Sequence, residues 1–143
     1  MKFIIITLFP EMFSGVIDIS ILGRAHEKGL IEFEFVNPRE FGIGLRKKVD
    51  DTPYGGGAGM VLRVDVMSAA IEFAKKRTDK TSKIILMTPQ GVRLTQPKLE
   101  NMANFSGDYI IICGHYEGFD ERIRSLVDEE VSVGDFVLTG GEL

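Results

Sequence analysis

Short apolar runs of strand length recur along the chain and alternate with segments of helical spacing. Buried or half-buried strands are expected at four of these runs, residues 2–8, 31–36, 83–87 and 109–113. Strands joined by helices lie parallel, because a parallel pair needs a long crossover connection. The order of the runs therefore predicts an α/β fold with a largely parallel sheet flanked by helices.

Helices are expected in three of the connections, residues 10–27, residues 65–76 and a short segment after Thr95. In the first of them, Met12, Val16 and Ile19 fall on one face, which is typical of an amphipathic helix. Asp65 and Thr95 precede helical spacing and are the expected N-caps, since their side-chain oxygens accept hydrogen bonds from free backbone N–H groups.

The size and composition suit one ordinary globular domain with a core of its own. The chain has 143 residues, of which 44% are apolar and 27% are charged. The first apolar run ends before Pro10 and is far shorter than the roughly 20 residues of a membrane span. One cysteine permits no internal disulfide, and two histidines leave little for a zinc site. We expect a cytoplasmic, metal-independent protein without membrane association.

Two glycine-bearing segments, residues 38–63 and the tail after Gly114, fit neither the strand nor the helix pattern. Segments of this length without regular structure are usually functional or mobile. Residues 1–113 carry 15 basic and 13 acidic side chains, whereas residues 114–143 carry 2 and 8. The best candidates for contacts to a nucleic-acid backbone therefore lie in the first segment, at Arg39, Arg46, Lys47, Lys48 and Arg63. The alternative is that these side chains form only a solvated surface.

Three strand-like runs end in glycine-bearing loops, residues 87–91, 114–118 and 133–141. Ligands of open α/β sheets bind beyond the carboxyl ends of the strands, so these loops are expected to line one crevice. Glycine allows backbone N–H and C=O groups to approach a flat ligand such as a purine ring. Apolar neighbours that could enclose the ring are Met87, Val133, Phe136 and Leu138. The alternative is that these are ordinary turn glycines.

The glycine-rich stretch 53–60 is not a known phosphate cradle. No Gly-Lys-Ser/Thr follows it, so it is not a P-loop, and the first strand is not followed by G-x-G-x-x-G. The stretch is expected either to fold over a substrate or to be a flexible surface loop.

Reactive side chains near the second loop have two interpretations each. Cys113 lies in an apolar run two residues before His115, and a buried structural thiol is expected rather than a nucleophile. Three carboxylates, Glu117, Asp120 and Glu121, are either acid/base groups or charges at a helix N-terminus, because basic residues follow at positions 122 and 124.

Four separated motifs together resemble one family. They are Ile6-Thr7-Leu8-Phe9-Pro10-Glu11-Met12-Phe13, Asp50-Asp51-Thr52-Pro53-Tyr54-Gly55-Gly56-Gly57-Ala58-Gly59-Met60, Cys113-Gly114-His115-Tyr116-Glu117-Gly118-Phe119-Asp120-Glu121-Arg122 and Ser132-Val133-Gly134-Asp135-Phe136-Val137-Leu138-Thr139-Gly140-Gly141-Glu142-Leu143. In this order they closely resemble the bacterial tRNA (guanine-N1)-methyltransferases. The resemblance covers the chain from end to end.

This resemblance implies a SPOUT-type fold with a C-terminal trefoil knot, a homodimer, and methylation of N1 of guanosine-37 in tRNA by S-adenosylmethionine. Carried over by motif, the cofactor-binding residues are Met87, Thr88, Pro89, Gly114, Tyr116, Glu117, Gly118, Val133, Gly134, Asp135, Phe136, Val137, Leu138, Gly140 and Gly141. The substrate-binding residues are Asp50, Pro53 and Gly59, which would touch guanosine, and Arg46, Lys47 and Lys48, which would meet phosphates. Glu117 would face either the positive end of the cofactor or a magnesium ion.

The family's catalytic aspartate and arginine lie beyond the motif that contains Leu143. Residues 1–143 are therefore expected to form the cofactor-binding and dimerisation domain, without the linker, the C-terminal tRNA-binding domain or a catalytic residue. The alternatives are a non-catalytic S-adenosylmethionine-binding and dimerising module, and an unrelated nucleotide-binding α/β protein. Whether the reading frame continues past Leu143 distinguishes the first alternative, and preference for ATP identifies the second.

Overall fold

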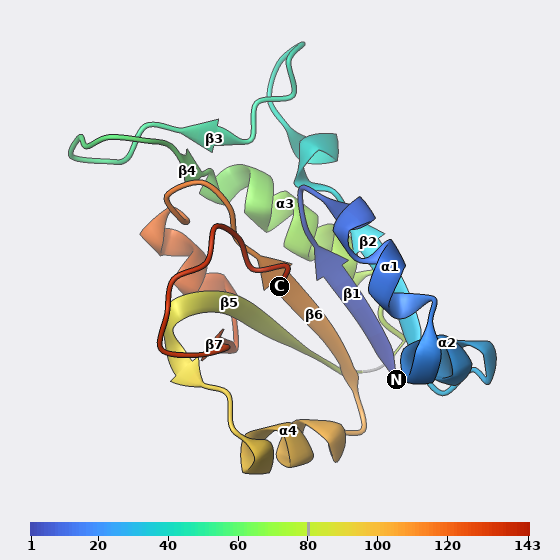
Figure 1. Ribbon diagram of the computed structural model, residues 1–143. Coiled ribbons are helices and arrows are strands. Elements are labelled where there is room, and N and C mark those ends of the chain that lie inside the picture. The colour runs from blue at the N-terminus through green and yellow to red at the C-terminus, as the bar shows by residue number, and fades with distance from the viewer. Residues whose placement is uncertain (80) are drawn as a thin grey trace.

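Five strands form one parallel sheet in the computed structural model, which describes residues 1–79 and 81–143. The sheet order is β2-β1-β6-β5-β7 (Figure 1). The strands are β1 (Lys2–Ile6), β2 (Glu32–Val36), β5 (Ser82–Arg93), β6 (Asp108–Cys113) and β7 (Glu129–Ser132). The expected α/β fold with a largely parallel sheet is confirmed.

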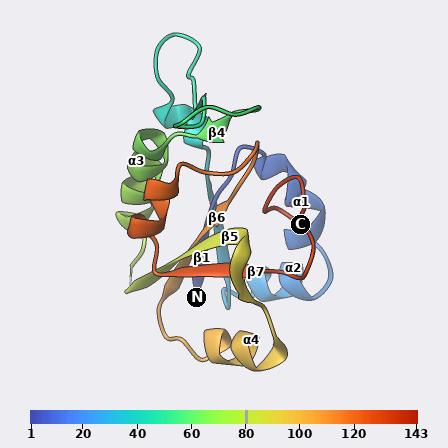
Figure 2. The same ribbon diagram turned by 90° about the vertical axis from the view of Figure 1, so that its left-hand side faces the viewer.

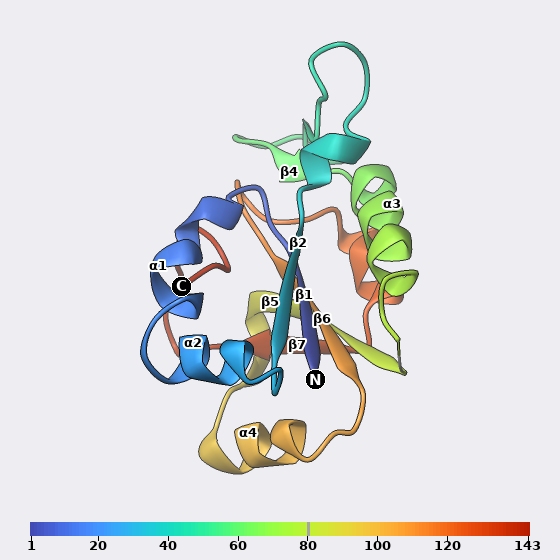
Figure 3. The same cartoon turned by 90° about the vertical axis from the view of Figure 1, so that its right-hand side faces the viewer.

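The main core lies on one face of this sheet, under α3 (Val64–Lys75) and the 3-10 helix η3 (Glu121–Leu126). Figures 2 and 3 show these two helices on one side of the strands and α1 (Ser14–Ile17), α2 (Ser20–Glu27) and the C-terminal segment on the other. Alternate residues of β1 and β6 point into the α3 side, where they meet the apolar stripe of the helix: Ile4, Ile6, Ile110 and Ile112 pack with Val66, Met67, Ala70, Ile71 and Ala74.

The second face is less completely covered. Its buried cluster has only Ile85, Tyr109 and Val131 at its centre, with partly buried side chains around them. The helix α4 (Gln96–Ala103) contributes Met102 to this cluster, and the Met102 carbonyl accepts a hydrogen bond from the Tyr109 hydroxyl at 2.9 Å. Thr95 caps α4 as expected, because its hydroxyl accepts from the Lys98 N–H at 3.4 Å.

The helix expected over residues 10–27 is wrong as a single element. The chain forms a 3-10 turn, η1 (Pro10–Met12), followed by α1 and α2, and it breaks where Ile19 is extended and Ser20 has φ +56°. The break places Gly23 against Asp18, where a Cβ would lie 2.6 Å from the Asp18 carbonyl oxygen. The residues expected on one apolar face are Met12, Val16 and Ile19, which remain 47%, 58% and 60% exposed.

The expected N-cap at Asp65 is also wrong, because the N-cap is Arg63, two residues earlier, and α3 begins at Val64. Asp65 instead lies in the first turn, where its carboxylate binds the Arg63 guanidinium at 2.8 Å. An acidic side chain is favourable there because the N-terminal end of a helix carries partial positive charge.

The segment 38–63 contains more regular structure than its sequence indicates. It holds the 3-10 turn η2 (Pro38–Phe41) and a small antiparallel hairpin of β3 (Asp50–Asp51) and β4 (Val61–Leu62). Arg63 ties the hairpin together, since its guanidinium also binds Asp51 at 2.6 Å. No helix among the described residues is both long and apolar enough to cross a membrane.

Candidate functional site

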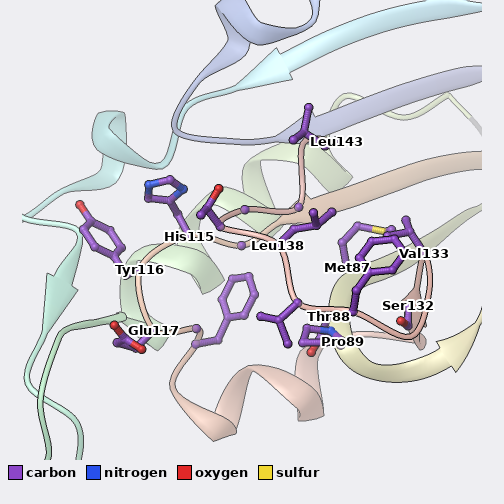
Figure 4. A pocket seen from close by; sticks show the side chains of 18 of the residues that line it. Met87, Thr88, Pro89, His115, Tyr116, Glu117, Ser132, Val133, Leu138 and Leu143 are labelled. Carbon is purple, nitrogen blue, oxygen red and sulfur yellow. The ribbon is translucent and has the colours of Figure 1, made fainter.

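A pocket of about 200 Å³ lies where β5, β6 and β7 lead into the loops that follow them (Figure 4). It is lined by residues around Met87, by the turn 114–119 after β6, and by the segment 131–143 that contains the end of β7. The volume is below the roughly 300–1,000 Å³ of many ligand pockets, so it suits one ring system of an elongated ligand.

The structure brings most of the expected cofactor residues together. Those that line the pocket are Met87, Thr88, Pro89, Gly114, Tyr116, Glu117, Gly118, Val133, Phe136, Val137, Leu138, Gly140 and Gly141. Gly134 and Asp135 do not line it. They belong to the bend that follows β7, where the buried Ser132 hydroxyl donates to the Gly134 carbonyl at 2.8 Å.

The first wall is a bulged strand. The expected loop 87–91 is part of β5, whose pairing with β7 shifts register between Met87 and Val92. A bulge of this kind bends the strand and re-aims its side chains. Here the bend turns Thr88 and Pro89 toward the pocket, as Figure 4 shows.

The back wall is made of main chain in close contact. The Gly141 N–H donates to the Gly114 carbonyl at 3.0 Å. A Cβ at Gly141 would lie 3.0 Å from the Cys113 Cα and 3.1 Å from the Met87 Cβ. The C-terminal segment therefore lies directly against the ends of β5 and β6, with no space for a side chain between them.

Six further residues line the pocket that the sequence did not indicate: His115, Phe119, Val131, Ser132, Thr139 and Leu143. His115 packs on Phe9, with ring centroids 4.8 Å apart, and its Nδ1 is buried without a hydrogen-bond partner among the described residues. The Phe119 ring covers Gly114, where a Cβ would come within 2.6 Å of it. All of them except Val131 stand inside the quoted motifs, but nothing in the sequence marked them as ligand-facing.

The glycine-rich segment borders this pocket and is attached to it. The Glu117 N–H donates to the Met60 carbonyl at 3.0 Å, and the Leu62 N–H donates to the Gly118 carbonyl at 2.9 Å. At Gly59, which has φ +85°, a Cβ would lie 2.3 Å from the Glu117 Cγ. Of the expected substrate residues, Gly59 is therefore next to the pocket.

The other expected substrate residues lie farther along the hairpin. Asp50 is in β3, and the Pro53 carbonyl accepts from Gly56 in the turn that follows. Arg46 and Lys47 are exposed in the loop between η2 and β3, and Lys48 pairs with Asp51 at 3.3 Å. None of these residues lines the pocket, and Figure 1 shows the loop between η2 and β3 projecting away from the sheet.

Two titratable groups beside the pocket have structural roles. Asp120 is the N-cap of η3, and a two-oxygen contact with the Arg122 guanidinium lowers its pKa to about 2. This supports the helix-charge interpretation for Asp120. Burial, with a smaller contribution from the Glu142 charge, raises the pKa of the Cys113 thiol to about 12, as expected for an inert buried thiol. Among the residues described, no group of three or more His, Cys, Asp or Glu is placed to hold a metal.

Comparison with known proteins identifies the family. The tRNA (Guanine-1)-methyltransferase TrmD family matches residues 1–143. The tRNA (guanine-N(1)-)-methyltransferases of Halalkalibacterium halodurans and Anoxybacillus flavithermus are 54% and 53% identical over 144 residues; this chain is covered completely and spans 58% of each relative's length.

A solved structure agrees with these matches. The crystal structure of tRNA (m1G37) methyltransferase from Aquifex aeolicus has a TM-score of 0.87 and 35% identity, covering 99% of this chain and 63% of that chain. The parallel sheet with its flanking helices is thus of the SPOUT type. The chain belongs to the tRNA (guanine-1)-methyltransferase family.

Proposed function

We propose that residues 1–143 form the S-adenosylmethionine-binding and dimerisation domain of an enzyme that methylates N1 of guanosine-37 in tRNA. The observation that carries this proposal is the convergence of three separate loops on one small, mostly apolar pocket at the carboxyl ends of the strands. Family membership supports the reaction class.

The residues of the pocket fit an adenosine group. Gly114 and Gly140 contribute main chain to the lining, and Leu138 and Met87 supply apolar surface for a ring. When bound, S-adenosylmethionine supplies a methyl group on a positively charged sulfur. The Glu117 carboxylate at the pocket rim is the acidic side chain that could attract that charge.

In the proposed transfer, the bound cofactor would supply the methyl group to N1 of guanine, so that a carbon–nitrogen bond would form as the carbon–sulfur bond breaks. The pocket would contribute mainly alignment of the donor, which raises the rate by holding reacting atoms at the correct distance. N1 carries a proton at neutral pH, so a base must remove it, and a cation should stabilise charge that develops toward O6.

A second candidate function, cofactor binding and dimerisation without turnover, is favoured by the pocket lining. The described residues of the lining include no Arg or Lys, and Glu117 is their only carboxylate. We therefore propose that the 143-residue polypeptide binds S-adenosylmethionine but transfers methyl groups to tRNA far more slowly than a full-length relative. Radiolabelled methyl transfer at a comparable rate would contradict this.

The glycine-rich segment is the proposed contact for the tRNA. Gly59, Pro53 and Asp50 would meet the guanosine, and the exposed Arg46 and Lys47 would meet phosphates. Replacing the basic residues 46–48 by alanine should flatten the salt dependence of tRNA binding, because each lost phosphate contact reduces the number of counterions released. If the salt dependence of tRNA binding did not change, these residues would not be part of the interface.

The proposed homodimer is supported by uncovered apolar surface on the side opposite α3. Val16, Ile19 and Ile21 are all more than half exposed there. Light scattering should give about twice the monomer mass, and Ile21→Glu should reduce it without unfolding the chain. We also propose a cytoplasmic location, in keeping with a tRNA substrate, and a knot formed where the segment 133–142 contacts the ends of β5 and β6.

Calorimetric titration with S-adenosylmethionine, S-adenosylhomocysteine and ATP tests the cofactor assignment. We expect both sulfur compounds to bind with similar affinity, because they share the adenosine group, and ATP to bind weakly. Tighter binding of ATP would favour the unrelated nucleotide-binding protein and overturn the proposal.

A further inference from the structure

The back wall of the pocket is joined to the first strand of the sheet by one hydrogen bond. The Thr7 hydroxyl donates to the Glu142 carboxylate at 2.8 Å, across 135 positions of sequence. Thr7 follows β1 directly and is completely buried. Glu142 itself does not line the pocket, but the two residues before it do.

Two hydrogen bonds to backbone groups hold Thr7 in place, in addition to its contact with Glu142. Its N–H donates to the Val36 carbonyl at 3.1 Å, and its hydroxyl oxygen accepts from the Phe9 N–H at 3.0 Å. The hydroxyl hydrogen is thereby free to point at the carboxylate. Hydrogen bonds to a charged acceptor are stronger than neutral ones, particularly where water is excluded.

The Glu142 carboxylate in turn lies beneath the glycine pair of the wall. A Cβ at Gly140 would stand 2.2 Å from the Glu142 Oε2 and 3.2 Å from both the Gly114 carbonyl oxygen and the His115 Nδ1. The carboxylate, the wall and the turn after β6 therefore occupy one closely packed space.

We propose that Glu142 and Thr7 are positioning residues that hold the Gly140–Gly141 wall in the shape required by the adenosine group. This role rests on the proposed function of the pocket as the S-adenosylmethionine site. Neither side chain touches the ligand. Their hydrogen bond fixes the last segment of the chain to the rigid sheet, so that the backbone of the wall is ordered before the ligand arrives.

The test is a titration of the 143-residue chain with S-adenosylmethionine, carried out well below the melting temperature of every variant. Thr7→Val removes the hydroxyl and keeps the β-branched shape, whereas Thr7→Ser retains the hydroxyl. Glu142→Ala removes the acceptor. We expect Thr7→Val and Glu142→Ala each to raise the Kd about tenfold, and Thr7→Ser to remain within about twofold of the wild type.

Two controls separate positioning from general loss of stability. Ile71→Val removes one methylene from the core under α3, away from the pocket, and should lower the melting temperature without changing the Kd. The double variant Thr7→Val/Glu142→Ala should bind no more weakly than either single variant, because both remove the same bond. If Thr7→Val does not fold, the Glu142→Ala titration decides alone.

An unchanged Kd in folded Thr7→Val and Glu142→Ala would overturn the positioning role while leaving the cofactor assignment intact. An equal rise in Ile71→Val would also overturn it, since the effect would then follow stability. A wild-type chain that binds no S-adenosylmethionine would overturn the proposed function, and the positioning role with it.

Discussion

Gly91 offers the most direct test of how the bulged strand forms the pocket wall. It lies in β5, where the strand crosses β7, and a Cβ there would lie 2.4 Å from the Val131 nitrogen and 2.5 Å from the Glu130 carbonyl carbon. Both neighbours are backbone atoms of a paired strand, so neither can rotate away. Gly91→Ala should therefore force β7 outward.

The size of the effect follows from these distances. Ordinary van der Waals contact begins at 3.4 Å, so β7 must retreat by about 1 Å, which is enough to break one or two ladder hydrogen bonds. Each is worth about 1 kcal/mol net, and steric overpacking adds about 1 kcal/mol. Alanine also restricts the unfolded chain more than glycine does, which stabilises the fold by about 0.5 kcal/mol. The free energy of unfolding should therefore fall by about 2 kcal/mol.

For a chain of this length, that loss corresponds to a melting temperature lower by about 4–8 °C, measurable by circular dichroism. Gly15→Ala is the matched control, because Gly15 lies in α1 with nothing within 4 Å of its Cβ position. That variant should be as stable as the wild type or more so by about 0.5–1 kcal/mol. If Gly91→Ala melted at or above the control, the close approach of the two strands would be refuted.

Three further results are expected. Asp120→Asn should lower stability at pH 7 but not below pH 2: the pKa of about 2 lies under the ordinary aspartate value of 3.8, so the contact with Arg122 stabilises the fold above about pH 4 and is lost as the pH falls toward 2; parallel urea curves at both pH values in wild type and variant check this. The Cys113 thiol should react with a thiol reagent at pH 8 about 1,000-fold more slowly in the folded than in the unfolded chain, and equal rates would contradict its burial. Gly59→Ala should weaken S-adenosylmethionine binding by displacing Glu117, and an unchanged calorimetric Kd would show that the two segments are independent.

The parallel sheet could be predicted from the sequence because its strands are buried on both faces or nearly so. Ile4, Ile6, Ile110 and Ile112 meet the helix side, while Ile5 is buried on the other side, and this produces continuous apolar runs that periodicity detects. At the place of β7 the sequence indicated only a strand-like run before the loop 133–141, and its bounds were not predicted, for the opposite reason. Its sequence begins with Glu129 and Glu130, whose side chains are partly exposed at the sheet edge.

The prediction of one helix over residues 10–27 was wrong because its apolar residues have helical spacing but are not buried against the chain's own core. Phe13 packs against Phe35 with ring centroids 5.3 Å apart, but Val16 and Ile19 point away from the core. Apolar residues at helical spacing predict that one face of a helix is covered, but they do not identify which surface covers it. A surface that is covered by another copy of the chain gives the same pattern as one that faces the chain's own core.

Most glycines of the site have a different role from the one that the sequence suggests. Glycine was expected in these loops because it lets the backbone approach a ligand. At Gly114, Gly134 and Gly141, however, the space of the missing Cβ is already filled or closely bordered by Phe119, Phe136 and the backbone of Cys113.

At Gly141 the neighbours are backbone atoms, so a side chain there would disturb the fold whether or not a ligand binds, whereas at Gly114 and Gly134 the rings of Phe119 and Phe136 would have to move. Gly118 differs, because its φ of +120° demands glycine although the surrounding space is open. Glycine content alone thus gives little evidence for a ligand. The stronger evidence is that internal contacts bring the ends of three strands together and still leave a cavity between them, since a chain that only needed tight packing would have filled it.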